Sequence, residues 1–223
     1  HRGRTLAVAG EGPIDADVFL IGEAPGREED ASGRPFVGSA GKVLEAALAV
    51  AGLPRKAVFI TNVVKCRPPE NRAPRADEME ACRPFLLGQI EAVRPKGLVT
   101  LGSTALRALM GTDIDLRHAR GKVLGVGANS VLPTYHPAAI LYNRHLERSL
   151  RNDLRKAARL MRRRPTRIRS GEPRKGRPTR LLRSSGAVVM KADRRVLLLR
   201  KRDEQVWCLP KGKIEKGETP EQA

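Results

Sequence analysis

The chain has 223 residues, and its 43 Lys and Arg against 24 Asp and Glu give a formal net charge of +19. A compact fold with this excess repels itself, so we expect a polyanionic partner, with nucleic acid first and an anionic membrane second. No apolar run approaches the roughly 20 residues of a membrane span, and no signal peptide is visible in a sequence that begins at His1. Three cysteines are too few for a disulfide framework and are expected to be reduced thiols or metal ligands.

The first 160 residues alternate short apolar runs with segments of helical periodicity. We predict strands at residues 18–21, 58–61, 97–101, 122–126 and 131–134. Helices are predicted at 41–50, 76–93, 103–109 and 146–163, the third capped by Ser103 or Thr104 and the fourth strongly basic. Such alternation predicts an α/β fold in which a parallel sheet has helices on both faces.

Two glycine-rich segments follow the first predicted strand: Gly-Glu-Ala-Pro-Gly at residues 22–26 and Gly-Arg-Pro-Phe-Val-Gly at 33–38. Proline and glycine interrupt strand and helix, so we expect a stiff loop at the carboxyl end of a strand, where open α/β sheets bind ligands. The loop carries the carboxylates of Glu23 and Glu29, and Phe36 stands between two glycines. An aromatic ring beside backbone donors and a carboxylate suits a planar heterocycle. A plain surface loop with a core phenylalanine is the alternative.

Two later strands also end in polar side chains. Asn62 lies in Thr-Asn-Val-Val-Lys-Cys-Arg-Pro-Pro at residues 61–69, and its carboxamide offers a donor and an acceptor to a pyrimidine edge, unless it only caps a turn. His136 follows the last of the predicted strands, and the proline after it restrains its backbone. The apolar residues Ile140 and Leu141 are expected in a short loop whose tip enters a base stack.

In this order and spacing, the segments above, together with Cys66 and Cys82, resemble the family 4, iron–sulfur type uracil-DNA glycosylases. The resemblance runs from about residue 4 to residue 161. It implies a three-layer α/β/α fold around a central parallel sheet. It also implies a DNA repair enzyme that flips uracil out of the helix and hydrolyses its N-glycosidic bond.

The resemblance gives three side chains a direct role at the flipped base. Phe36 stacks on the uracil ring, and Asn62 hydrogen-bonds its O4 and N3–H, which rejects cytosine. His136 donates to uracil O2, where negative charge gathers as the glycosidic bond breaks. A donor aimed at developing charge is worth roughly 3–4 kcal/mol.

The remaining implied roles concern the sugar, the water and the DNA. Glu23, with the backbone from Gly22 through Ala24 to residue 26, shapes the pocket and helps to place water. Glu29 is expected to face the oxocarbenium-like sugar. The residues expected to fill the gap in the stack or to contact the DNA are Ile140, Leu141 and Arg144.

Members of this family carry a [4Fe–4S] cluster held by four cysteines, and Cys66 and Cys82 match the later two. The earlier Cys-x-x-Cys pair is expected just upstream of His1, so we interpret the chain as a fragment of a cluster protein rather than as one that has lost its cluster. The cluster is expected to be structural, because base excision transfers no electrons.

The C-terminal third has a different character. Residues 162–183 are rich in Lys and Arg, which predicts a flexible linker that holds phosphates without reading sequence. Residues 184–223 resemble the start of a Nudix hydrolase domain, with two antiparallel strands expected at 186–191 and 196–200 and the first part of the Nudix box at 212–218. A plain hairpin is the alternative. Mg²⁺ is expected only for an intact Nudix domain, because the remaining box supplies its carboxylate ligands.

We therefore expect a glycosylase domain at 1–161, a basic linker at 162–183 and a truncated Nudix domain at 184–223. The alternatives are a pyrophosphohydrolase whose first domain binds nucleic acid, and a non-catalytic module that binds uracil-containing DNA. A related subgroup traps uracil covalently through an added loop, which residues 33–40 lack. Uracil-containing DNA is the expected partner of a monomer without membrane contact, in the cytoplasm of a bacterium or archaeon and active at the nucleoid.

Overall fold

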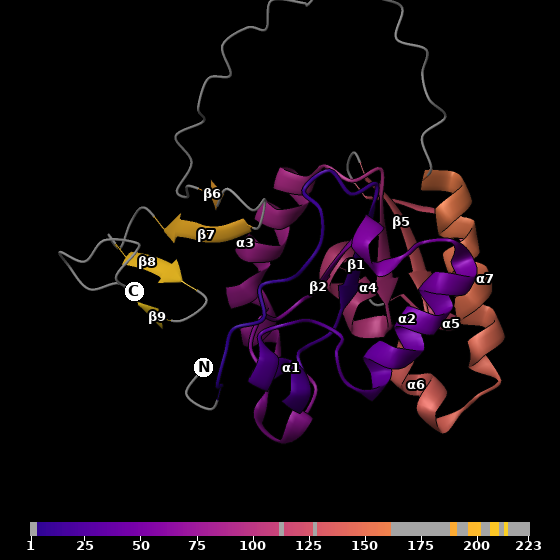
Figure 1. Ribbon diagram of the computed structural model, residues 1–223, viewed down its shortest axis with the longest axis horizontal. Coiled ribbons are helices and arrows are strands. Elements are labelled where there is room, and N and C mark those ends of the chain that lie inside the picture. Colours follow the sequence, from indigo (N-terminus) through magenta and orange to yellow (C-terminus); the bar gives the residue numbers. More distant parts are fainter. Residues whose placement is uncertain are drawn as a thin grey trace, which may run out of the picture.

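The computed structural model describes residues 4–111, 114–126 and 129–161, followed by four short stretches of strand between 188 and 213. The first three ranges form one sheet with helices on either side, as Figure 1 shows. The predicted linker and most of the Nudix-like region lie outside the described residues.

The sheet has five strands in the order β2-β1-β3-β5-β4. Their bounds are β1 Val18–Gly22, β2 Val58–Asn62, β3 Gly97–Leu101, β4 Leu124–Val126 and β5 Asn129–Thr134. The first four in this order pair in parallel, whereas β4 runs antiparallel to β5 because the connection between them is too short for a crossover. The five predicted strands are therefore confirmed, and four of them form the parallel part of the sheet.

The helices cover both faces of the sheet. Their bounds are α1 Arg27–Ser32, α2 Ser39–Ala51, α3 Ala76–Val93, α4 Ser103–Met110, α5 Leu116–Ala119, α6 Pro137–Tyr142 and α7 Leu146–Met161, with the 3₁₀ turns η1 Arg55–Ala57 and η2 Pro69–Asn71.

Each face of the sheet has its own apolar core. Leu20 and Leu132 belong to the core shared with α2, α6 and α7, whereas their neighbours Phe19 and Val131 belong to the core shared with α3 and α4. Figure 1 shows α3 on one side of the sheet and α2, α6 and α7 on the other. The alternation of strand side chains between the two cores confirms the predicted three-layer α/β/α fold.

Two segments predicted as loops are short helices. Helix α1 begins after Gly26 and carries three acids in its first turn, where the helix dipole favours negative charge. Helix α6 begins with Pro137 at its first position, where a missing N–H costs nothing, and His136 is its N-cap. In both cases the proline or glycine that signals a loop marks a helix start.

The cap of α4 also differs from the prediction. Its N-cap is Gly102, with φ of 94°, and no side chain caps the helix. Neither Ser103 nor Thr104 does so; the Thr104 hydroxyl binds elsewhere, as described below.

The described C-terminal strands form a second sheet that is antiparallel throughout. Its strands are β6 Val188–Met190, β7 Val196–Lys201, β8 Val206–Leu209 and β9 Gly212–Lys213, in the order β6-β7-β8-β9. The pairing of β6 with β7 confirms the predicted hairpin; its turn and most of the Nudix box lie outside the described residues.

Candidate active site

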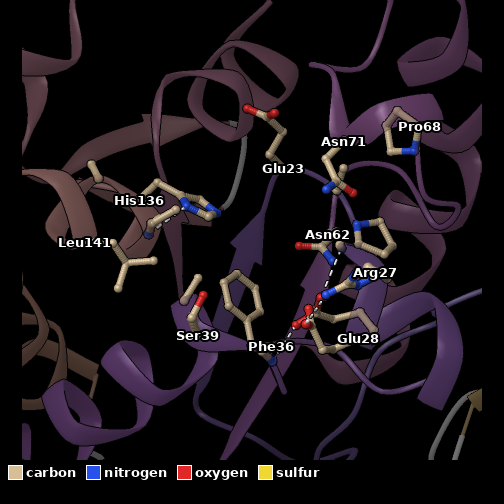
Figure 2. Close-up of a pocket in the computed structure, with 18 of the residues that line it drawn as sticks. Glu23, Arg27, Glu28, Phe36, Ser39, Asn62, Pro68, Asn71, His136 and Leu141 are labelled. Atoms are coloured by element: carbon tan, nitrogen blue, oxygen red, sulfur yellow. Dashed lines mark hydrogen bonds and ion pairs between the residues drawn. The ribbon is translucent and has the colours of Figure 1, made fainter.

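A cavity of about 500 Å³ lies where β1, β2 and β5 end. It is lined by residues from four segments: 23–29 after β1, 36–40 at the start of α2, 62–72 after β2 and 136–142 after β5. Because parallel strands end at one edge of the sheet, segments far apart in sequence meet there. Figure 2 shows Phe36, Asn62, His136 and Glu23 around this space.

Phe36 lies against the end of β1. Its side chain is 7% exposed, and its ring centroid is 5.8 Å from that of His136 with the two planes inclined by 35°. Gly22 makes this possible, because a Cβ at this position would collide with the Phe36 ring and with Asn62 Oδ1. The ring is therefore both a core contact and an aromatic wall of the pocket.

Asn62 presents an unpaired acceptor. The residue is 1% exposed, and within the described part of the chain its buried Oδ1 has no hydrogen-bond partner. In Figure 2 this oxygen points to the side of the pocket where Phe36 and His136 lie. A buried polar atom without a partner is costly, so a ligand that donates to it would gain the hydrogen bond the protein lacks.

The end of β2 is fixed from behind by a buried lysine. Lys65 Nζ donates to the Asn62 carbonyl at 2.7 Å, to Thr61 Oγ1 at 2.6 Å and to Gln89 Oε1 at 2.8 Å. All three acceptors are neutral, and burial lowers the pKa of Lys65 to about 7. These bonds hold the backbone that carries the Asn62 carboxamide.

The imidazole of His136 has a defined proton position. Its Nδ1 accepts from the backbone N–H of Ala138 at 3.2 Å, so in the neutral ring the proton is on Nε2. Burial lowers the pKa of His136, and the nearby Glu23 carboxylate offsets part of that effect. At neutral pH the ring is therefore an uncharged donor through Nε2.

Glu23 lines the pocket together with Ala24, which is also partly buried in the core against α3. Thr104 Oγ1 donates to Glu23 Oε2 at 2.5 Å and fixes the orientation of the carboxylate. The sequence predicts Thr104 only as a possible cap of α4, so it does not predict this hydrogen bond to Glu23.

Glu29 is bound by backbone groups of the loops that border the cavity. Although it borders the cavity, its Oε2 accepts from Gly26 N at 3.0 Å and its Oε1 accepts from the N–H groups of Val37 and Gly38, both at 2.9 Å. Three backbone donors engage both oxygens, so the carboxylate holds the loops on either side of α1.

The expected apolar tip is only partly correct. Ile140 is 4% exposed and belongs to the core beside α7, so it is not available to DNA. Leu141 is 47% exposed and borders the cavity, and Tyr142, which sequence reasoning missed, is 92% exposed beside it. Arg144 is exposed in the next turn of chain. Because α6 is a helix, Ile140 points into the core while the adjacent Leu141 points outward.

Cys66 and Cys82 are free and partly buried. Cys66 Sγ accepts from Arg4 Nη1 at 3.0 Å, and Cys82 Sγ accepts from Lys65 N at 3.5 Å. Burial raises the pKa of Cys82, and the neighbouring Cys66 adds to this. Among the described residues no group of three or more His, Cys, Asp or Glu could hold a metal ion. Two adjacent thiols with N–H donors suit half of a four-cysteine cluster site.

Two regions of the chain match known protein families. Residues 9–159 match the family described as the uracil DNA glycosylase superfamily, and residues 180–223 match the NUDIX domain. Within the part of the chain that the structure describes, no helix is long and apolar enough to cross a membrane.

Curated relatives cover most of the first region. A type-4 uracil-DNA glycosylase of Thermotoga maritima is 45% identical over 161 residues, which are 70% of this chain and 84% of the relative. The type-4 enzyme of Sulfurisphaera tokodaii is 48% identical over 162 residues, 69% of this chain and 74% of the relative. A type-5 enzyme of Pyrobaculum aerophilum is 34% identical over 168 residues, 66% of this chain and 73% of the relative. The chain belongs to the uracil-DNA glycosylase superfamily.

Proposed function

We propose that this chain removes uracil from DNA by hydrolysing the N-glycosidic bond. The observation that carries the proposal is the buried Oδ1 of Asn62, which has no hydrogen-bond partner among the described residues; Asn62 lines a cavity walled by Phe36 and His136. The names of the type-4 relatives agree with it.

Recognition follows from complementary hydrogen bonding. Uracil presents N3–H as a donor beside O4 as an acceptor, and the Asn62 carboxamide offers Oδ1 and Nδ2–H in the matching order. Cytosine presents the opposite pattern, an N3 acceptor beside an N4 donor. Phe36 provides the surface on which the flipped ring stacks.

Cleavage follows from the charge that develops on the leaving base. As the bond from N1 to C1′ breaks, uracil keeps the electron pair and the negative charge spreads to O2. The neutral His136 ring donates from Nε2 to that oxygen. Glu23, oriented by Thr104, directs the water that adds to C1′ and completes hydrolysis.

We also assign the surroundings of the pocket. The exposed Leu141 occupies the gap in the base stack, and Arg144 contacts a phosphate. Glu29 positions the loop of Phe36 and touches no reacting atom. We further propose that the chain acts as a monomer, because one copy supplies every side chain invoked here, and that it acts at the nucleoid, because its proposed substrate is DNA.

For the cofactor, we propose that Cys66 and Cys82 supply two of the four thiolates of a [4Fe–4S] cluster. When bound, such a cluster supplies a rigid cross-link between the loop after β2 and helix α3. The reaction steps above depend only on side chains around the cavity.

The test is direct. The chain is incubated with matched duplexes that contain uracil, thymine or cytosine at one position, and the released base is identified by mass spectrometry. We expect free uracil and an abasic site from the first duplex only. Binding without release would favour the non-catalytic module, and release of thymine or cytosine at a similar rate would contradict the role of Asn62.

A further inference from the structure

The backbone at Phe36 adopts a conformation that side chains rarely take. Its φ is 51°, in the left-handed region, where the Cβ of a non-glycine residue is crowded. Such a conformation persists only when neighbouring groups impose it. We therefore expect the peptide groups around Phe36 to be held by neighbouring residues.

The amides that follow Phe36 are held on one side. Glu29 Oε1 accepts from both Val37 N and Gly38 N at 2.9 Å, and the carboxylate is itself fixed by Gly26 N. Glu29 therefore defines the path of the chain as it leaves Phe36.

The carbonyls that precede those amides are held on the other side by Arg55, in η1. Its Nη1 donates to the Phe36 carbonyl at 3.0 Å and its Nη2 to the Pro35 carbonyl at 2.5 Å. The Arg55 side chain is 16% exposed, and Glu11 lies 3.5 Å from its Nε. Gly41 completes the fit, because a Cβ there would collide with the Phe36 carbonyl.

We infer that Arg55 is a positioning residue that presets the Phe36 ring for stacking on the extruded base, through its paired hydrogen bonds to the Pro35 and Phe36 carbonyls. The inference rests on the proposed function and adds to it a residue that touches no substrate. Arg55 and Glu29 hold consecutive peptide groups from opposite sides, so the ring does not have to be ordered when the base arrives.

The planar guanidinium is important to this arrangement. Two parallel N–H groups reach two successive carbonyls, which a single ammonium cannot reproduce with the same geometry. Glu11 is shared with Arg34, which binds it through Nε at 2.9 Å and Nη2 at 3.0 Å but is more exposed. Arg34 therefore offers a matched control that shares the carboxylate partner of Arg55.

The test compares Arg55→Lys and Arg55→Ala with the control Arg34→Ala. Inhibition by free uracil reports the base pocket, and binding to a duplex with an abasic site reports DNA contacts without a base. For Arg55→Ala we expect the inhibition constant of uracil to rise about tenfold, equivalent to about 1.4 kcal/mol, with abasic-site binding unchanged. We expect Arg55→Lys to recover only part of the loss and Arg34→Ala to change neither value.

A double variant separates positioning from a general effect on folding. If Arg55 acts through Phe36, Arg55→Ala causes no further loss when added to Phe36→Ala. Additive losses, or a loss of abasic-site binding equal to the loss of uracil binding, would overturn the inference.

Hydrogen exchange tests whether Arg55 restrains this loop, independently of uracil release. The amides of Val37 and Gly38 should exchange faster in Arg55→Ala than in the native chain or in Arg34→Ala. If the native chain released no uracil, the proposed function would fail, and exchange at these two amides would still decide whether Arg55 holds the loop. Unchanged exchange would refute that restraint.

Discussion

Replacing Asn62 by aspartate tests base recognition at its most specific point. The carboxamide is buried, and its Oδ1 has no partner within the described residues, so solvent does not readily replace a hydrogen bond lost there. Asn62→Asp keeps the size of the side chain but removes the N–H that meets uracil O4. The hydrogen-bonding pattern of the pocket is then wrong for uracil.

The magnitude follows from the burial of the site. Loss of one hydrogen bond with an acceptor left unpaired costs about 1–3 kcal/mol, and more when a charge is involved. At about 3 kcal/mol, kcat/KM for uracil falls roughly 150-fold. This loss applies to the ionised Asp. Burial raises the pKa of a carboxyl group, and the protonated Asp can carry its O–H on either oxygen, so it can pair with cytosine N3 and N4 as well as with uracil. Cytosine release should therefore rise from background.

The assay is single-turnover release from matched uracil and cytosine duplexes. The control is Asn152→Asp, the same chemical change at an exposed position of α7, which should leave both rates within about twofold. Equal losses on both bases, or unchanged selection of uracil, would refute the reasoning about Asn62.

Four further results are expected. His136→Gln should lower the rate of the chemical step by roughly 3–4 kcal/mol, or 150- to 800-fold, with little change in DNA affinity. Because burial lowers the pKa of His136, the acid limb of the native rate profile should lie below pH 6.5, and Glu23→Gln should move it lower still by removing the carboxylate that favours the imidazolium. Asp153→Ala should reduce the free energy of unfolding by about 3 kcal/mol in urea, because it leaves Arg120 without the buried carboxylate it binds at 2.8 Å. Leu141→Ala should slow release from duplex DNA more than from single strands, since only the duplex must be opened.

A specific result would contradict each of these expectations. Equal losses of rate and DNA affinity in His136→Gln would point to a structural role. An acid limb above pH 6.5 would mean that His136 is not the titrating donor. For Asp153 the control is Asp115→Asn, which keeps the side-chain oxygen that caps α5 and removes only the charge of exposed ion pairs, so its effect should be small; an effect at Asp115 as large as that at Asp153 would contradict the buried network. Equal slowing on both DNA forms would remove Leu141 from the base stack.

The sheet was predictable because its strands are continuous apolar runs bounded by turn residues. The predicted ranges 97–101 and 131–134 lie within or match β3 and β5, and the carboxyl ends of the strands correctly placed Asn62 and His136 at one edge. For these strands, the apolar pattern of the sequence agrees with the position of each strand in the sheet.

What sequence reasoning missed depends on contacts between distant segments. Nothing near Arg55 indicates that its guanidinium meets the Phe36 carbonyl, and the acidic run containing Glu29 does not show that its carboxylate meets backbone amides. The sequence predicts a loop that exposes both Ile140 and Leu141, whereas α6 is a helix that turns Ile140 into the core and Leu141 outward. A short helix that starts at proline has too few turns for its periodicity to be recognised.

In the proposed mechanism, uracil is bound and cleaved between Phe36, Asn62 and His136. The most direct measurement is a crystal structure with a duplex that carries a 2′-fluorinated deoxyuridine, in which the electron-withdrawing fluorine slows loss of the base. We expect the base to be extruded and stacked on Phe36, with N3–H donating to Asn62 Oδ1 and O2 accepting from His136 Nε2. A base that remains in the helix, or that is held elsewhere on the protein while this cavity stays empty, would contradict the account.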